Sequence, residues 1–258
     1  MSNNIDKLAI PFMTAVARVK PLKNNKEFPG GIVRFNDIHS SLTAIPTGRS
    51  DAIVLIDSGE DRDANNIKSF LKNRKWNFSN IVATLITHAH ADHTGGLDII
   101  GSESKSVTFI SEPDSKVLSG ERRSQGPIPG LFDLLTHKNL AAATSIKPEI
   151  IKDDQIIEID DLVFRCISMP GHTDGSVGFV VSNDIVGYNL FFPGDALDFS
   201  FIGKKVKNAY KIMTNNNEQS RLSIISARDR INDLGINIDF VIPSHSGEGD
   251  FELLQNFR

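Results

Sequence analysis

The sequence has 258 residues, of which 40% are hydrophobic, and a formal net charge of −4. This length suffices for a sizeable core, and we expect a single domain over residues 1–258, built as two similar halves at about 1–150 and 151–258. The charge balance disfavours nucleic acid as a partner, the single cysteine excludes an intrachain disulfide, and no apolar run approaches the roughly 20 residues that span a bilayer.

The amino terminus contains an apolar stretch that only partly matches a secretory signal. Leu8 to Ala17 is mostly apolar and follows Lys7, but Pro11 interrupts it and Asp6 lies where positive charge should dominate. We therefore expect a first strand here and a cytoplasmic protein, with an exported protein as the weaker alternative.

Short apolar segments separated by turns open the first half. Residues 32–35, 41–45 and 52–56 are typical of strands that pair in sequence order as an antiparallel meander. The third strand runs into Asp57-Ser58-Gly59. The spacing of apolar residues then predicts a helix over 67–76, with Asp63 or Asn65 as its cap.

The densest group of metal-ligand residue types follows the next strand. Residues 81–86 are apolar and rich in β-branched side chains, as in a buried strand, and lead directly into the segment Thr87 to His93, THAHADH. Neutral imidazole and ionised carboxylate suit Zn²⁺ and related divalent metals. The first two imidazoles project side by side from extended chain, whereas the aspartate and the third histidine lie beyond them. The spacing therefore predicts two adjacent metal positions.

The remaining elements of the first half are shorter. We expect a helix from about residue 95, a strand over 107–110 and a helical turn over 114–118. Gly120 to Gly130 is rich in glycine, proline and polar residues, which indicates a loop that forms a lid or a substrate wall.

The second half repeats this architecture without repeating the sequence. Strands are expected over residues 156–159, 162–168, 176–181, 188–192 and 240–242, and a closing helix passes through 251–254. A helix over 220–234 is predicted to place Leu222, Ile225 and Ile231 on one apolar face. Lys204 to Lys211 contains four lysines, which predict a cleft wall that attracts an anionic substrate, unless they simply form a solvated face.

Five of the seven histidines and three aspartates follow apolar strands or their immediate turns: His88, His90, His93, His172, His245, Asp57, Asp92 and Asp195. Strand ends of this kind can converge on one edge of a pair of sheets. Cys166 lies inside an apolar strand, so we expect it in the core. His39 and His137 are expected to be ordinary polar residues, with His39 as a weaker candidate for the cleft lining.

These segments resemble the motifs of the metallo-β-lactamase fold superfamily, in the same order and over essentially the whole chain: Ile56-Asp57-Ser58-Gly59, Thr87 to His93, Gly171-His172-Thr173, Gly194-Asp195 and Ser244-His245-Ser246-Gly247. The resemblance implies an α/β fold, a four-layer αββα sandwich with a dinuclear metal site at one edge.

The resemblance also implies a role for each residue. His88, His90 and His172 correspond to ligands of a first metal, and Asp92, His93 and His245 to ligands of a second, with Asp195 bridging the two. Asp57 corresponds to a buried aspartate that supports the metal loop from behind, because ligating imidazoles usually donate their other N–H to such an acceptor.

The implied activity is that of a metal-dependent hydrolase. Two Zn²⁺, with iron or manganese as alternatives, would hold a hydroxide that attacks the carbonyl of a small ester, thioester, lactone or lactam. Asp92 is the expected catalytic residue, because it can orient the hydroxide and pass a proton to the leaving group. A phosphodiesterase or nuclease on the same metal pair, and a mononuclear-iron sulfur dioxygenase, stay open as alternatives.

Individual branches of the superfamily match less well. Glyoxalase II-like thioester hydrolases carry a helical carboxy-terminal region for glutathione, whereas this sequence ends 13 residues after His245. Acyl-homoserine lactonases have tyrosine at the position of Asp198. Persulfide dioxygenases share Gly194-Asp195-Ala196-Leu197 but not the residues after it. We therefore expect a small-molecule substrate without assigning a branch.

Overall fold

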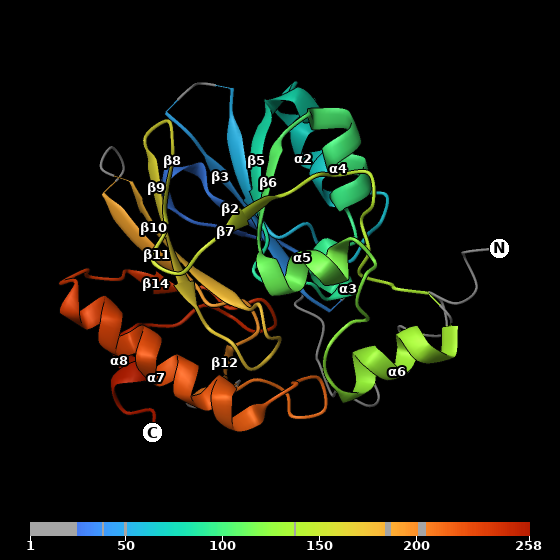
Figure 1. Ribbon diagram of the computed structural model, residues 1–258. Helices are drawn as coiled ribbons and strands as arrows, with labels where there is room; N and C mark the ends of the chain where they lie inside the picture. The colour runs from blue at the N-terminus through green and yellow to red at the C-terminus, as the bar shows by residue number, and fades with distance from the viewer. Residues whose placement is uncertain (1–24, 38, 49–50, 137, 184–186, 201–204) are drawn as a thin grey trace.

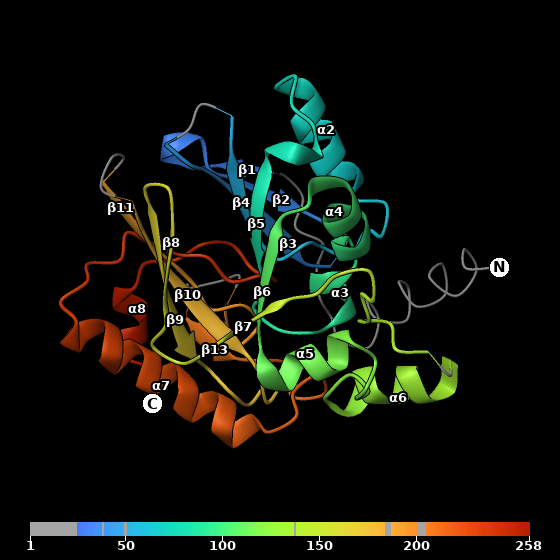
Figure 2. The same ribbon diagram turned by 45° about the horizontal axis from the view of Figure 1, so that its top comes forward.

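The computed structural model describes residues 25–258 apart from 38, 49–50, 137, 184–186 and 201–204. Two mixed β-sheets lie face to face, and helices cover their outer faces (Figures 1 and 2). This arrangement confirms the expected α/β sandwich of four layers. The apolar stretch over residues 8–17, as well as His137 and Lys204, lies outside the described residues.

The first sheet has seven strands that neighbour one another in chain order. They are β1 (Lys26–Glu27), β2 (Val33–Asn36), β3 (Ser41–Pro46), β4 (Ile53–Ile56), β5 (Ile81–Leu85), β6 (Val107–Ser111) and β7 (Glu149–Ile151). Strands β1 to β4 pair antiparallel, which confirms the predicted meander, and β4 to β7 pair parallel.

The second sheet has the strand order β14-β11-β10-β9-β8. Its strands are β8 (Ile156–Ile159), β9 (Leu162–Ser168), β10 (Val177–Asn183), β11 (Tyr188–Phe192) and β14 (Phe240–Val241). Only β11 and β14 pair parallel. A separate antiparallel pair joins β12 (Leu197–Phe199) to β13 (Val206–Asn208).

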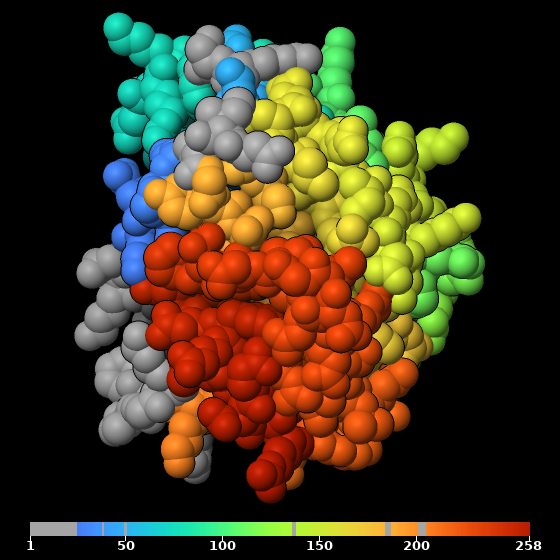
Figure 3. Space-filling view, turned by 90° about the vertical axis from the view of Figure 1, so that its left-hand side faces the viewer, coloured from blue at the N-terminus to red at the C-terminus, as the bar shows by residue number. Residues whose placement is uncertain are grey.

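Helices α2 (Asn65–Asn73) and α4 (Leu97–Ser104) lie on the first sheet, and α7 (Asn217–Asp233) and α8 (Glu252–Gln255) lie on the second (Figure 1). Figure 3 shows the second helical layer from outside, in orange and red. The other helical segments are η1 (Pro29–Gly31), η2 (Phe78–Asn80), α3 (Ala91–Thr94), α5 (Glu112–Leu118) and α6 (Pro127–Thr136). Among the described residues, no helix has the length and apolar character needed to traverse a bilayer.

Alternation along the strands explains the layers. In β4, Val54 and Ile56 pack between the two sheets, whereas Ile53 and Leu55 pack toward α2. In β10, Phe179 packs between the sheets and Val180 packs against α7. Strands buried on both faces read as continuous apolar runs, and the rigid sheets they form fix the loops at their ends.

The amino terminus of α2 differs from the prediction. Neither Asp63 nor Asn65 caps it; the residue before the helix is Ala64, with φ +49° and no side-chain cap. The carboxylate of Asp61 instead accepts hydrogen bonds from the backbone N–H groups of Asp63 and Asn65, at 2.9 and 2.8 Å. The turn before the helix therefore supplies the acceptor that a cap residue would otherwise provide.

The buried face of α7 was predicted only in part, because Ile231 is buried as expected and Leu222 is not. Leu222 is 50% exposed, and the face toward the sheet is formed by Ile224, Ala227 and Ile231. These residues follow the spacing of three and four that one helix face requires. Leu222 lies two positions before Ile224, which places it about 200° around the helix.

The loop expected over residues 120–130 is shorter than predicted, because α6 begins at Pro127. Proline is compatible with the first turn of a helix, where its missing N–H has no intrahelical partner. The glycine, proline and polar residues of the segment predicted a loop and gave no sign that a helix begins at Pro127.

Candidate metal centre

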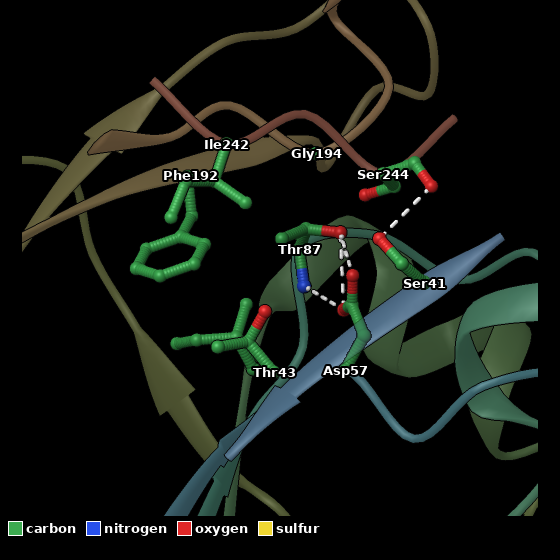
Figure 4. Close-up of a pocket in the computed structure, with 9 residues that line it drawn as sticks. Ser41, Thr43, Asp57, Thr87, Phe192, Gly194, Ile242 and Ser244 are labelled. Carbon is green, nitrogen blue, oxygen red and sulfur yellow. Dashed lines mark hydrogen bonds between the residues drawn. The ribbon is translucent and has the colours of Figure 1, made fainter. Parts of the chain in front are cut away.

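The strands that precede the candidate ligands end at one edge of the sandwich. Val177 N–H donates to Thr87 O at 2.8 Å, and this bond joins the start of β10 to the residue before His88. Gly194, with φ +57°, lies so close to Thr87 that an added Cβ would come within 2.8 Å of the Thr87 hydroxyl (Figure 4). Glycine is therefore required where Asp195 approaches the first sheet.

Three imidazoles and one carboxylate form the first group of ligand-type side chains: His88, His90, His172 and Asp195. The Nδ1 atom of His90 lies 3.1 Å from His88 Nε2 and 3.0 Å from His172 Nε2. The Oδ2 atom of Asp195 lies 3.4 Å from His172 Nε2 and 3.8 Å from His88 Nε2.

The second group lies beside the first and consists of Asp92, His93, Asp195 and His245. Asp195 Oδ1 lies 3.2 Å from His93 Nε2, and Asp195 Oδ2 lies 2.7 Å from His245 Nε2. Asp92 Oδ2 lies 3.6 Å from His93 Nε2 and 3.4 Å from His245 Nε2. The structure thus brings all seven sequence-predicted ligand residues together, and Asp195 belongs to both groups.

Backbone carbonyls and a carboxylate fix the tautomer of three imidazoles. His90 Nε2–H donates to Gln125 O at 2.8 Å, and His245 Nδ1–H donates to His39 O at 2.6 Å. His93 Nδ1–H donates to Asp57 Oδ2 at 2.8 Å. Because these acceptors cannot donate, the opposite ring nitrogen of each neutral imidazole carries a lone pair toward the ligand groups.

Threonine hydroxyls fix the other two imidazoles. The Thr214 hydroxyl donates to Tyr210 O and therefore accepts from His172 Nδ1–H at 3.1 Å. The Thr87 hydroxyl donates to the Asp57 carboxylate and accepts from His88 Nδ1–H at 3.1 Å. In all five imidazoles the inward ring nitrogen is consequently the one that carries the lone pair when the ring is neutral, as in ligating histidines.

This arrangement fits a pair of divalent cations. The inward nitrogens of His88, His90 and His172 face one another at 3.0–3.1 Å without a proton to share, an arrangement that a cation stabilises. Among the described residues, the buried atoms His93 Nε2 and Asp195 Oδ1 also lack a hydrogen-bond partner. Buried polar atoms without partners are costly, and metal coordination would satisfy them.

The charge of the two groups differs. Burial, together with the neighbouring His90, lowers the pKa of His172 to about 3, and burial with His93 holds the pKa of His88 well below its usual range. Both side chains are therefore neutral at physiological pH, the form in which an imidazole can bind a metal. Burial opposes the charging of His245, but Asp195 and Asp92 outweigh it and raise its pKa to about 10. The carboxylates of the second group thus favour a positive charge beside them, which either a proton on His245 or a bound cation can supply.

Asp57 is buried behind both ligand groups and holds Thr87, which precedes His88, and His93 by hydrogen bonds. It is 1% exposed, and its carboxylate accepts from Thr87 N–H and from the Thr87 hydroxyl, both at 2.8 Å (Figure 4). It also accepts from His93 Nδ1–H. Ser41 and Thr43 help to line a cavity of about 10 Å³ next to it, which leaves room for about one water molecule. The support of the metal loop is therefore closely packed.

Other residues tested by the structure have no place among the ligands. Cys166 is fully buried between the sheets, and burial together with Asp153 raises its pKa to about 12, which confirms its expected place in the core. The His39 side chain is buried and bonds to Glu60 at 3.0 Å; its backbone carbonyl, rather than its ring, supports His245. The sequence did not identify Gln125 and Thr214 as residues that hold the imidazoles of His90 and His172. The one available signal was the position of Gln125 in the loop predicted over residues 120–130.

Comparison with known proteins supports the same assignment. The sequence profile of the Metallo-beta-lactamase superfamily matches residues 47–245. A probable metallo-hydrolase of Streptococcus pyogenes serotype M6 is 30% identical over 157 residues, which are 59% of this chain and 60% of that protein. A hydroxyacylglutathione hydrolase of Shewanella sp. strain ANA-3 is 28% identical over 166 residues, 62% of this chain and 51% of that protein. The chain thus spans about half to 60% of the length of these relatives.

Solved structures share the fold. The Rm3 metallo-beta-lactamase is 17% identical, with a TM-score of 0.64 and coverage of 89% of this chain and 81% of that chain. BJP-1, a subclass B3 metallo-beta-lactamase of Bradyrhizobium japonicum, is 19% identical, with a TM-score of 0.62 and coverage of 90% and 81%. The profile match covers most of the chain and ends at His245, the last of the candidate ligands. The chain therefore belongs to the metallo-beta-lactamase superfamily.

Proposed function

We propose that the protein is a metal-dependent hydrolase that cleaves a small-molecule carbonyl substrate. The proposal rests on one observation: two adjacent groups of inward-facing imidazole nitrogens and carboxylate oxygens share Asp195. Such a site needs no serine or cysteine nucleophile, because it activates water directly. The relative named a probable metallo-hydrolase supports the same class of activity.

The chain's own residues divide the work of such a reaction. Two divalent cations, when bound, stabilise negative charge on the carbonyl oxygen and lower the pKa of water. His88, His90 and His172 are at most 2% exposed and form a rigid wall. The Asp92 side chain is 22% exposed, against 8% for Asp195. Asp92 Oδ2 is therefore placed to orient the attacking water, accept its proton and pass that proton to the leaving group.

Among carbonyl substrates, a thioester is the first to test. The relative from Shewanella is named for hydroxyacylglutathione, an acyl thioester of glutathione. A thioester carries a good leaving group and an electrophilic carbonyl, which suit attack by an activated water. A lactone, p-nitrophenyl acetate and bis-p-nitrophenyl phosphate complete the panel. A preference for bis-p-nitrophenyl phosphate would identify a phosphodiesterase in place of a hydrolase of carbonyl substrates.

Removal of metal is expected to stop the reaction. Dialysis against a chelator should lower kcat/KM for the best substrate by on the order of 10²-fold or more, because the charge on the carbonyl oxygen loses its stabilisation. Zinc, iron and manganese, added back separately with the bound metal measured, identify the ion that restores the rate. A chelated preparation that retained full hydrolytic activity would remove the basis of the proposal.

The lysines near β13 are proposed to attract an anionic substrate. Lys205, Lys207 and Lys211 are exposed, and β13 pairs with β12, which begins two residues after Asp195, so that Lys207 faces Asp198 across the pair. Changing the three lysines to glutamine should raise KM for a glutathione thioester by about tenfold, because the local positive field is lost. KM for neutral p-nitrophenyl acetate should stay the same.

A matched control places the same three substitutions at Lys68, Lys72 and Lys75, which are exposed in α2 or just after it, on the outer face of the first sheet. This control should leave KM for both substrates unchanged. Equal KM values for the anionic substrate in the test variant and in wild type would argue that the lysines near β13 form an ordinary solvated surface.

A further inference from the structure

Asp114 is a buried carboxylate that the proposed reaction does not use. It lies in the first turn of α5 and is 0% exposed. Its Oδ2 atom accepts a hydrogen bond from Ala89 N–H at 2.7 Å and another from the Thr173 hydroxyl at 2.8 Å. Ala89 lies between His88 and His90, and Thr173 follows His172 directly.

The first ligand group is assembled from both sheets. His88 and His90 follow β5 in the first sheet, whereas His172 follows β9 in the second. His90 and His172 are 82 residues apart in the chain, yet their facing nitrogens lie 3.0 Å apart. The geometry of this group therefore depends on how the two loops are held against each other, and one oxygen atom of Asp114 bonds to both.

The surroundings of Asp114 leave it little freedom. The Ser111 hydroxyl donates to Gly175 O at 2.6 Å, so a second residue beside α5 holds the same turn. An added Cβ at Gly175 would lie 2.6 Å from Asp114 Oδ1 and 2.3 Å from Ser111 Oγ. Only glycine lets the turn after His172 approach this closely, and this contact fixes Asp114 relative to the loop that carries His172.

A carboxylate suits this position better than a neutral acceptor. Two donors converge on one oxygen, which an ionised carboxylate accommodates well because it has about four lone-pair sites and stronger hydrogen bonds. The first group contains three imidazoles, two of which are held neutral by burial. A negative charge behind them adds attraction for a cation without occupying a ligand position, and Asp114 belongs to neither ligand group.

We propose that Asp114 is a positioning residue that sets the metal affinity of the first group by locking the His88–His90 loop to the His172 loop. The inference rests on the metal centre of the proposed function. It predicts a selective effect, because Asp114 Oδ2 bonds to Ala89 and Thr173, in the loops of the first group, and not to Asp92, His93 or His245.

The test measures zinc affinity and does not depend on turnover. Metal-depleted wild type, Asp114→Asn and the control Asp239→Asn are titrated with Zn²⁺ in competition with a chromophoric chelator. Asp239 also accepts from a backbone N–H, that of Asn189 at 2.9 Å, but far from the ligand loops. Asp114→Asn should weaken one of two zinc positions by about 10–100-fold, whereas Asp239→Asn should match wild type.

Two further backgrounds identify the affected position. In His245→Ala, which damages the second group, adding Asp114→Asn should weaken the remaining site by the same factor. In His172→Ala, which damages the first group, adding it should change nothing. If Asp114→Asn does not fold, Thr173→Val replaces it, because it removes only the hydroxyl that joins Asp114 to the His172 loop.

The outcomes separate this inference from the proposed function. Wild-type protein that binds two zinc ions but hydrolyses no substrate of the panel would refute the hydrolase and leave the role of Asp114 supported or refuted by the titrations alone. Wild-type zinc affinity in Asp114→Asn, or an equal loss in the His172→Ala and His245→Ala backgrounds, would overturn the inference. Failure of the wild type to bind any of zinc, iron and manganese would overturn both.

Discussion

Replacing Asp195 with alanine is expected to lower kcat/KM by on the order of 10³-fold, because this residue belongs to both ligand groups. Its two oxygens face different imidazoles, Oδ1 toward His93 and Oδ2 toward His245. Burial alone would raise the pKa of Asp195, but His245 and His93 outweigh it and hold the pKa well below its usual range. The substitution therefore removes a permanent negative charge from the space between the two groups.

The measurement combines metal content with kinetics. Asp195→Ala should bind at most one zinc per chain and show no rate above the metal-free background. Asp198→Asn provides the matched control, because Asp198 is also buried, three residues further along, and belongs to neither ligand group; it should retain two zinc ions. An Asp195→Ala protein with two bound zinc ions and substantial activity would contradict a shared ligand.

The parts of the site that the sequence predicted are those in which residue type and position both carry information. His88, His90 and Asp92 are dense in the chain and follow an apolar strand, so their type and their place at a strand end could be read together. His172, Asp195 and His245 are single residues, and only the order of the surrounding motifs made them recognisable. That His172, Asp195 and His245 lie together could be seen only once the strand order of the two sheets was known.

The supporting contacts that could not be predicted from the sequence are those in which a residue acts through its backbone or through a partner distant in the chain. Gln125 and His39 support imidazoles with their carbonyl oxygens, which every residue possesses. Asp114 resembled an ordinary residue in the first turn of a short helix, where acidic side chains are common. Leu222 was wrongly placed on the buried face of α7 because serines share that face with Ile224 and Ile231, so apolar residues alone did not define it.

Replacing Asp57 with alanine is expected to destabilise the metal-free protein by at least about 4 kcal/mol. Three buried donors lose their acceptor together: Thr87 N–H, the Thr87 hydroxyl and His93 Nδ1–H. Each unsatisfied donor costs about 1–3 kcal/mol, and alanine at φ +60° adds about 1–2 kcal/mol of backbone strain. A loss of this size is a large part of the roughly 5–15 kcal/mol that stabilises a typical domain.

Urea unfolding of chelated protein measures this effect without the contribution of bound metal. Thr84→Val is the matched control on the neighbouring strand β5. The Thr84 hydroxyl is fully buried and has no hydrogen-bond partner among the described residues, so its removal should leave stability unchanged or increase it. Asp57→Asn should fall between the two, because asparagine tolerates positive φ but offers only one acceptor oxygen. If Asp57→Ala unfolded at the same urea concentration as wild type, the packing around Asp57, and not its carboxylate, would be what stabilises this region of the protein.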